Sequence, residues 1–398
     1  MAASTISAAT SALLAGARVV TPDGVRPDAW VQIGGDTIVG VQDRRPADDV
    51  PVVDLAGAWL VPGYVDLHVH GGGGHSVADS REAMDAAVAY HRGRGTTSTL
   101  VSLVTAPADA LAAQAAWAAE LTRRGPSPRG CVLGCHLEGP FLSPRRRGAQ
   151  NAAHMIAPDL EVLARLIRAA EGELRMMTLA PELEGALELI APLRDAGAVV
   201  ALGHSDATYE QAMAAIEAGA THATHLFNGM GPLHHRSPGL AGAALAAGLS
   251  CELINDGRHL HPAIVALVAR SVQRPVLITD AIDATGAGDG TFDLGGQEVH
   301  VLDGEARLAG SRSLAGSTLT MDEALRRAVI ESHLPIERAA AAAATNPARV
   351  LGLEHVLGSI AAGRRADLVV LDDELRVTAV RAAGAWMHGD PRLSSKLV

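Results

Sequence analysis

Two histidines lie one residue apart at the end of an apolar run, in the segment PGYVDLHVHGGGG at residues 62–74. In a strand, side chains at positions i and i+2 point to the same face, so His68 and His70 point together. Such a pair can bind a divalent metal or can form hydrogen bonds in a tight turn, and the motif alone does not decide between the two. The glycines at 71–74 permit a sharp turn and a close approach of the backbone to a ligand.

Polar side chains follow four further apolar runs, each at the point where a predicted strand ends. They are Glu138, His204, His225 and Asp280. A buried core would not repeatedly place such residues at strand ends, whereas convergence on the mouth of one barrel explains all of them. Imidazole and carboxylate groups suit Zn²⁺ or a similar divalent ion. The pattern therefore predicts a metal centre.

The elements that position these residues change character along the chain. Residues 13–61 predict short strands separated by turns. From residue 64, short apolar runs alternate with Ala-rich helical stretches, which is typical of parallel strands inside a ring of helices and, at this length, of a (β/α)8 TIM-like barrel. Helices are expected at 107–122, 158–170, 184–196, 208–218, 261–271, 321–332 and 336–345.

Strand character returns near the C-terminus, in the segment GSIAAGRRADLVVLDDELRVTAV. We therefore expect the two β-rich ends of the chain to pair into one small β-sandwich domain, formed by residues 1–62 and 350–398. The metal-dependent catalytic barrel would then occupy residues 63–349.

The composition of the 398-residue chain limits its class of partner. A formal net charge of −11 leaves no basic face for nucleic acid. No apolar run is long enough for a membrane helix, and the N-terminus lacks the pattern of a secretory signal. Three cysteines, Cys131, Cys135 and Cys251, are too few for a disulfide scaffold, so we expect a cytoplasmic protein.

The strand-end residues resemble those of the amidohydrolase superfamily of metal-dependent hydrolases. Many of its members bridge two metals with a carboxylated lysine, but the single lysine here is Lys396, close to the C-terminus. Glu138 would therefore take that role. With glutamate in this position, the sequence resembles the N-acetylglucosamine-6-phosphate deacetylase family over nearly the whole chain from about residue 13. The resemblance is carried by the motifs HLEGPF, GHSDAT, THLFNGM, NDGRHLHP and LAGSTLTMDEAL.

The resemblance implies hydrolysis of N-acetylglucosamine 6-phosphate to glucosamine 6-phosphate and acetate by a metal-activated water. The principal metal ligands would be Glu138, His204 and His225. A second site is implied by His68 and His70, so each chain would bind one or two divalent ions. Zn²⁺ is the first expectation, and Fe²⁺, Co²⁺ and Mn²⁺ also fit such ligands.

The same resemblance implies the catalytic and substrate contacts. Asp280 would take a proton from the water and pass it to the leaving nitrogen. His259 would polarise the carbonyl and contact the sugar. Arg236 would hold the phosphate of a substrate in the neighbouring subunit of a homodimer. The remaining substrate contacts implied are Ala149, Gln150, Asn228, Gly229, Asp256, Gly257, Arg258, Leu314, Ala315 and Gly316.

Three alternatives share much of this pattern. A related enzyme could hydrolyse a cyclic amide or deaminate another substrate. N-acetylgalactosamine 6-phosphate differs from the glucosamine compound at one hydroxyl. A catalytically inactive sugar-phosphate sensor could use the same barrel, although the intact set of Glu138, His204, His225 and Asp280 disfavours it.

Overall fold

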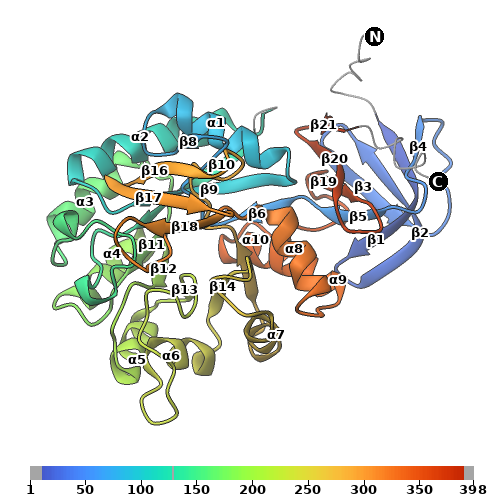
Figure 1. The fold of residues 1–398 in the computed structure, drawn as a ribbon. Helices are drawn as coiled ribbons and strands as arrows, with labels where there is room; N and C mark the ends of the chain where they lie inside the picture. The colour runs from blue at the N-terminus through green and yellow to red at the C-terminus, as the bar shows by residue number, and fades with distance from the viewer. Residues whose placement is uncertain (1–10, 128–129, 390–398) are drawn as a thin grey trace.

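Residues 11–127 and 130–389 are described by a computed structural model (Figure 1). Helices surround a barrel, and a second sheet built from the blue and red ends of the chain lies beside it. The N-terminal segment without a signal pattern and Lys396 lie outside the described residues, as do the outer ends of the expected small domain.

Eight strands form the barrel, and every pair of neighbours is parallel. Their spatial order is β15 (Pro275–Ile278), β14 (Ser250–Ile254), β13 (His222–Ala223), β12 (Val199–Leu202), β11 (Leu174–Leu179), β10 (Cys131–Glu138), β9 (Thr96–Val104) and β6 (Tyr64–Asp66). The first and last strands meet just beyond their ends through a parallel bridge between Val69 and Ala281. There the Asp280 N–H donates to the His68 carbonyl over 2.8 Å. The predicted barrel is confirmed, and it closes at two of the predicted site residues.

The helices pack their apolar faces against this barrel. They are α1 (Arg81–Arg92), α2 (Ala108–Arg124), α3 (Leu160–Ala169), α4 (Ile190–Asp195), α5 (Tyr209–Ala218), α6 (Gly239–Ala247), α7 (Pro262–Ser271), α8 (Met321–Ile330), α9 (Ile336–Ala340) and α10 (Asn346–Val350). Local signals set several starts: Thr208 and Gln211 form a capping box on α5, and Asp159 accepts two backbone N–H groups of α3. No helix in the described part of the chain is long and apolar enough to cross a membrane.

Strands from both chain ends form one further sheet. They are β1 (Ala12–Thr21), β2 (Gly24–Gly34), β3 (Thr37–Gln42), β4 (Val52–Asp54), β5 (Trp59–Pro62), β19 (Leu368–Leu371), β20 (Val377–Ala382) and β21 (Ala385–His388). Antiparallel pairing of β5 with β19 joins the two ends, and the sheet has a core of its own that includes Leu14, Val31 and Val370. The expected small β domain is therefore confirmed, while its boundaries at 62 and 350 stay a prediction.

A small antiparallel sheet follows the last barrel strand and was not expected from the sequence. It consists of β16 (Gly290–Leu294), β17 (Gln297–Leu302) and β18 (Glu305–Leu308). Its inner side chains, among them Val299, pack with Ala149 and Ile282 in a separate cluster. Because residues 149 and 282 flank the predicted site in sequence, this sheet covers part of the barrel mouth.

The glycine run at 71–74 contains the short strand β7 (Gly71–Gly72), which pairs with β8 (His75–Ser76). A Cβ on Gly71 would lie 2.5 Å from the Asp283 nitrogen, and one on Gly72 would lie 2.5 Å from His91 Nε2. Only glycine fits such close approaches. His91 Nε2 in turn donates to the Gly71 carbonyl over 2.8 Å. The run therefore packs the loop after the two histidines against α1 and the loop after β15.

Candidate active site

The predicted ligands lie at one rim of the barrel, at the carboxyl ends of its strands, where barrel active sites are built. Glu138 is the last residue of β10, and the histidines follow β6, β12 and β13. His204, His225 and Asp280 have positive φ angles of 45°, 26° and 53°. Residues other than glycine rarely adopt this backbone conformation, which costs on the order of 1–3 kcal/mol at each such residue. Such strain is typical of functional sites.

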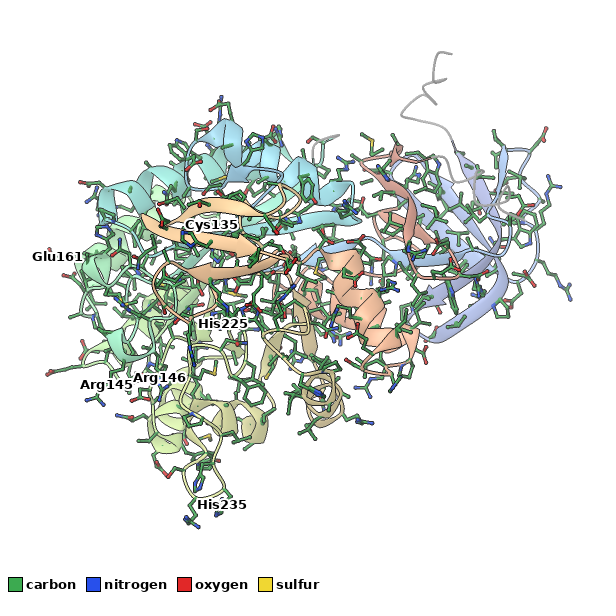
Figure 2. All side chains as sticks on the ribbon, viewed as in Figure 1. Cys135, Arg145, Arg146, Glu161, His225 and His235 are labelled. Carbon is green, nitrogen blue, oxygen red and sulfur yellow. The ribbon has the colours of Figure 1, made fainter. Side chains whose placement is uncertain are left out.

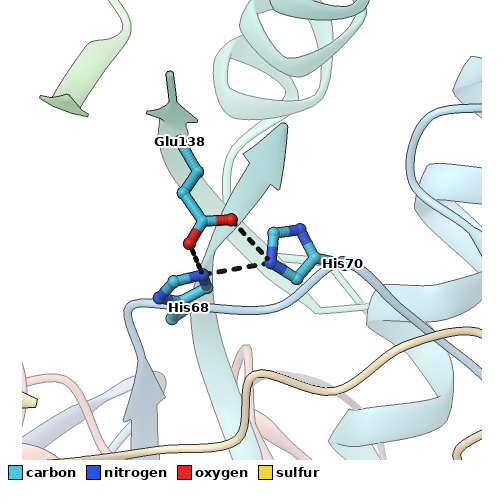
Figure 3. Close-up of side chains that lie close together, drawn as sticks. All are labelled: His68, His70 and Glu138. Carbon is cyan, nitrogen blue, oxygen red and sulfur yellow. Dashed lines mark hydrogen bonds and ion pairs between the residues drawn. The ribbon is translucent and has the colours of Figure 1, made fainter. Parts of the chain in front are cut away.

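Glu138 lies between two pairs of histidines. Its Oε1 lies 3.0 Å from His204 Nε2 and 2.9 Å from His225 Nε2, and these two nitrogens are 3.1 Å apart. On the other side, His70 Nε2 is 3.4 Å from Glu138 Oε2, and His68 Nε2 is 3.5 Å from Oε1 (Figure 3). The nitrogens of His68 and His70 are 3.0 Å apart.

Three of these four imidazoles, those of His204, His70 and His68, donate from the opposite ring nitrogen, Nδ1. His204 Nδ1 donates to the Arg146 carbonyl over 2.8 Å, and His70 Nδ1 donates to the Ser102 carbonyl over 2.9 Å. His68 Nδ1 donates over 3.1 Å to a buried carboxylate, that of Glu252. Carbonyl and carboxylate oxygens only accept, so in each neutral ring Nε2 carries a lone pair.

With neutral rings, the Nε2 lone pairs of His68, His70 and His204 would face one another and the carboxylate of Glu138, so these contacts favour positive charge among them, either protons on the rings or a metal ion. Ligands placed tetrahedrally at the usual zinc distance lie about 3.3 Å from one another, close to the separations seen here. Two ligand sets share Glu138: His68, His70 and Glu138, and Glu138, His204 and His225. The residues present fit a divalent metal ion.

The pKa shifts show the same preference for positive charge. Burial alone would lower the pKa of His70, but hydrogen bonds with Asp280 and Glu138 outweigh it and raise the pKa to about 9. Burial would raise the pKa of Glu138, but the surrounding His68 and His204 hold it well below its usual range. Glu138 therefore stays ionised and attracts cations.

A pocket opens over this cluster at the barrel mouth, and most of the predicted site residues line it. They are His70, Glu138, Ala149, Gln150, His204, His225, Asn228, Gly229, His259, Asp280, Leu314 and Gly316. Four lining residues were not foreseen, namely Val104, Gly148, Leu294 and Ser313. Leu294 comes from β16, so the unexpected sheet contributes to the pocket wall.

A sequence model of the amidohydrolase family matches residues 59–387. The chain belongs to this family. It is similar to the N-acetylgalactosamine-6-phosphate deacetylase of Escherichia coli O157:H7, with 39% identity over 94% of this chain and 97% of that protein. It is 38% identical to the N-acetylglucosamine-6-phosphate deacetylase of Homo sapiens, over 90% of this chain and 91% of that protein.

Solved structures of related deacetylases have the same fold. A variant of the N-acetyl-D-glucosamine-6-phosphate deacetylase of Mycobacterium smegmatis, in complex with N-acetyl-D-glucosamine 6-phosphate, has a TM-score of 0.90 and 42% identity, covering 95% of this chain and all of that one. The Thermotoga maritima enzyme has a TM-score of 0.85 and 33% identity, covering 95% of this chain and 100% of that one. Amidohydrolases are metal-dependent, and the ligand sets at Glu138 agree with this.

Several predicted substrate contacts of this amidohydrolase make other contacts. The Gln150 amide donates to Glu138 Oε2 and accepts from the Thr105 N–H, so it orients that carboxylate. Asp256 Oδ2 accepts from His259 Nδ1 over 2.7 Å, which turns the opposite edge of the ring towards the pocket. Arg258 donates to the Asp303 carbonyl. Neither Asp256 nor Arg258 lines the pocket, and the same holds for Gly257, Ala315 and the buried His68.

Arg236 lies away from the pocket of its own chain. It belongs to an exposed loop that Figure 2 shows projecting from the barrel body, with His235 labelled at its tip. The Arg236 guanidinium donates to His235 Nε2 over 2.8 Å. No contact with the predicted ligands is therefore made by this arginine within the described residues of one chain.

The sequence did not point to the residues that support the ligands. Glu252 is fully buried, and its partners are distant in the chain. The one available signal was a carboxylate in the apolar run SCELI of β14. The carbonyls of Ser102 and Arg146 could not have been found, because any residue type presents the same backbone oxygen. Cys131, Cys135 and Cys251 are buried free thiols outside the pocket, as expected of packing residues.

Proposed function

We propose that this hydrolytic enzyme removes the acetyl group of N-acetylglucosamine 6-phosphate, giving glucosamine 6-phosphate and acetate. The observation that carries the proposal is Glu138, placed between two imidazole pairs in a pocket that also contains Asp280. The similarity to named deacetylases over more than nine-tenths of their length supports the same reaction.

The two histidine pairs and Glu138 would hold one or two divalent ions, of which Zn²⁺ suits imidazole and carboxylate ligands best. When bound, such an ion polarises the acyl carbonyl and makes water a stronger acid. The chain's own residues orient the substrate and move the protons.

Asp280 is suited to act as the general base and then the general acid. Its Oδ1 lies 3.2 Å from His70 Nε2 and 3.5 Å from His68 Nε2, at the pocket wall. Burial would raise the pKa of Asp280, but the charge of His68 and the hydrogen bond of His70 hold it below its usual value. The carboxylate is therefore ionised at neutral pH, so it can accept a proton from water and pass it to the amide nitrogen as the C–N bond breaks.

His259 is placed to hold the acyl oxygen. Asp256 fixes the ring by accepting from Nδ1, and in the imidazolium form of the ring Nε2 would donate towards the pocket. A donor aimed at the oxygen that gains negative charge lowers the barrier of amide hydrolysis.

The substrate phosphate requires a cation from outside this pocket. Among the described residues, no arginine or lysine lines it. We place this cation in a homodimer, in which each subunit would supply Arg236 from its exposed loop to the phosphate in the other. Guanidinium groups bind phosphate oxygens strongly, so the arrangement would restrict the enzyme to phosphorylated sugars. A cytoplasmic location agrees with the three free thiols.

Acetate release tests the proposed reaction. We expect N-acetylglucosamine 6-phosphate to have a kcat/KM at least about 100-fold above that of unphosphorylated N-acetylglucosamine, because a phosphate-binding arginine without its partner stays unpaired. Equal values for the two sugars would contradict the phosphate contact. Because the Escherichia coli relative is named for the galactosamine compound, N-acetylgalactosamine 6-phosphate is the second candidate. A higher kcat/KM for that compound would replace the first assignment.

A further inference from the structure

Glu252 is a carboxylate enclosed by hydrogen-bond donors beneath the barrel mouth. It lies on β14 between Cys251 and Leu253, and its exposed fraction is 0%. Its Oε2 accepts from His68 Nδ1 over 3.1 Å and from the His225 backbone N–H over 3.0 Å. Its Oε1 accepts from His222 Nε2 over 3.1 Å. Two of the three donors belong to predicted metal ligands.

The contact with His68 determines which nitrogen faces Glu138. A carboxylate accepts only, so the ring proton stays on Nδ1, and the Nε2 lone pair points at His70 and Glu138. With an apolar residue in place of Glu252, the Nδ1 proton would lose its partner and the ring could turn or change tautomer. Carboxylates that hold metal-binding imidazoles in this way tune both orientation and affinity.

The contact with His225 holds the other histidine pair. His225 has a positive φ of 26°, which its side chain disfavours. Its N–H donates to the Glu252 side chain, and the next residue, Leu226, donates its N–H to the Glu252 carbonyl over 2.9 Å. Glu252 therefore fixes the turn that aims His225 at Glu138.

An apolar side chain would pack equally well at this buried strand position, so packing does not explain the carboxylate. Removing a carboxylate from water is costly unless hydrogen-bond donors compensate it. The neighbours Cys251, Leu253 and Ile254 on β14 are apolar and buried, as expected of a barrel strand. The hydrogen bonds with His68, His222 and the His225 backbone explain the charged residue here.

We propose that Glu252 is a positioning residue of the metal centre, which presents His68 to the second ion and fixes the backbone at His225. Without it, the set of His68, His70 and Glu138 binds its ion weakly. The inference rests on the proposed function for the presence of metal at Glu138.

The test is metal binding by the full-length Glu252→Gln variant. Its amide oxygen can still accept, but its NH2 group faces one of the donors that the second carboxylate oxygen served. We expect Zn²⁺ at the His68 set to bind about 10–100-fold more weakly. Elemental analysis after dialysis against buffered Zn²⁺ should therefore show two ions per wild-type chain and one per variant chain. Titration with Co²⁺, followed by its visible absorption, reports the same loss without relying on activity.

The matched control is His222→Gln. This change keeps a donor to Glu252 Oε1 and alters no predicted ligand, so we expect two ions per chain. Equal metal loss in both variants would mean that the packing around Glu252 matters rather than its contacts with the ligands, and would overturn the inference.

Glu252→Asp keeps a carboxylate on a shorter side chain and serves if Glu252→Gln does not fold. We expect it to bind the second ion more weakly than wild type and more tightly than Glu252→Gln. Wild-type affinity at the second site in every folded Glu252 variant would contradict the inference alone. A wild-type chain that binds one ion at the His204 set and none at the His68 set would likewise overturn the inference, whereas a wild-type protein that binds no divalent ion would contradict the proposed function.

Discussion

Two buried glutamates on parallel barrel strands have opposite surroundings. Glu138 on β10 and Glu252 on β14 both lie within 3.5 Å of a ring nitrogen of His68. Three N–H groups point at Glu252, so its charge is balanced within the protein. Three of the four imidazoles around Glu138, those of His68, His70 and His204, donate from Nδ1 to other oxygens, so a metal ion among the Nε2 atoms would balance the charge of Glu138.

The difference shows that residue type and burial do not separate a metal ligand from a residue that supports one. Both carboxyl groups have a pKa well below the usual range, against the effect of burial, because histidines surround them. The two roles differ in the hydrogen-bond donors that face each carboxylate. Which ring nitrogen of a histidine faces the carboxylate depends on which ring nitrogen donates to a backbone carbonyl.

The largest effect is expected at Asp280, the third carboxylate near these imidazoles. Asp280→Asn keeps the shape of the side chain but removes its ability to accept a proton. We expect kcat to fall by about 10²–10⁴-fold, the usual contribution of a general base, with metal content near that of wild type. Full activity in this variant would exclude Asp280 as the acid/base.

Glu138→Gln separates the two buried glutamates by metal affinity. A neutral amide is a much weaker metal ligand than a carboxylate, so we expect affinity at both ligand sets that share Glu138 to fall by more than about 100-fold, beyond the range typical of supporting residues such as Glu252. Elemental analysis measures the loss. Glu161→Gln, on the exposed face of α3 and labelled in Figure 2, is the control and should keep its metal. Stoichiometric metal in Glu138→Gln would contradict its role as a ligand.

Arg236→Gln tests whether an arginine of one subunit balances the charge of the substrate phosphate bound at the barrel mouth of the other subunit. We expect KM for the phosphorylated sugar to rise about 10–100-fold, because a charge-assisted contact is lost while the metal-binding residues stay intact. Arg44→Gln changes an exposed arginine of the small β domain and should leave KM unchanged. Steady-state kinetics on both variants decide this, and an unchanged KM in Arg236→Gln would remove the phosphate contact.

His91 shows what burial does to a histidine without a carboxylate partner. Burial lowers its pKa to about 4, and Nε2 donates to the Gly71 carbonyl. Because the unfolded chain binds this proton from pH 6.5 downwards and the folded protein only near pH 4, His91 should destabilise the protein by up to about 3 kcal/mol as pH falls through that window.

Urea unfolding between pH 7 and pH 4 measures this loss. The expectation is that His91→Gln flattens the pH dependence relative to wild type. His300→Gln, at an exposed position beside Glu298, should not change it. An unaltered pH dependence of stability in His91→Gln would show that burial does not lower the pKa of this histidine.

Local patterns predicted the barrel and its candidate ligands, because a polar residue stands in the sequence directly at or after the end of an apolar strand, as at Glu138 and His204. The α6 helix was missed, since its Ala- and Gly-rich sequence has no polar face. The sheet of β16–β18 was missed because it is short and packs only on loops of the mouth. Glu252 could not be recognised, since His68 lies 184 residues away.

Anomalous X-ray diffraction at the zinc edge from Zn²⁺-loaded crystals would show directly whether metal ions bind at Glu138. We expect a peak within about 2.0–2.2 Å of Glu138 Oε1, His204 Nε2 and His225 Nε2, and a second peak beside His68 and His70. Crystals with zinc bound elsewhere, and none among these atoms, would contradict this expectation.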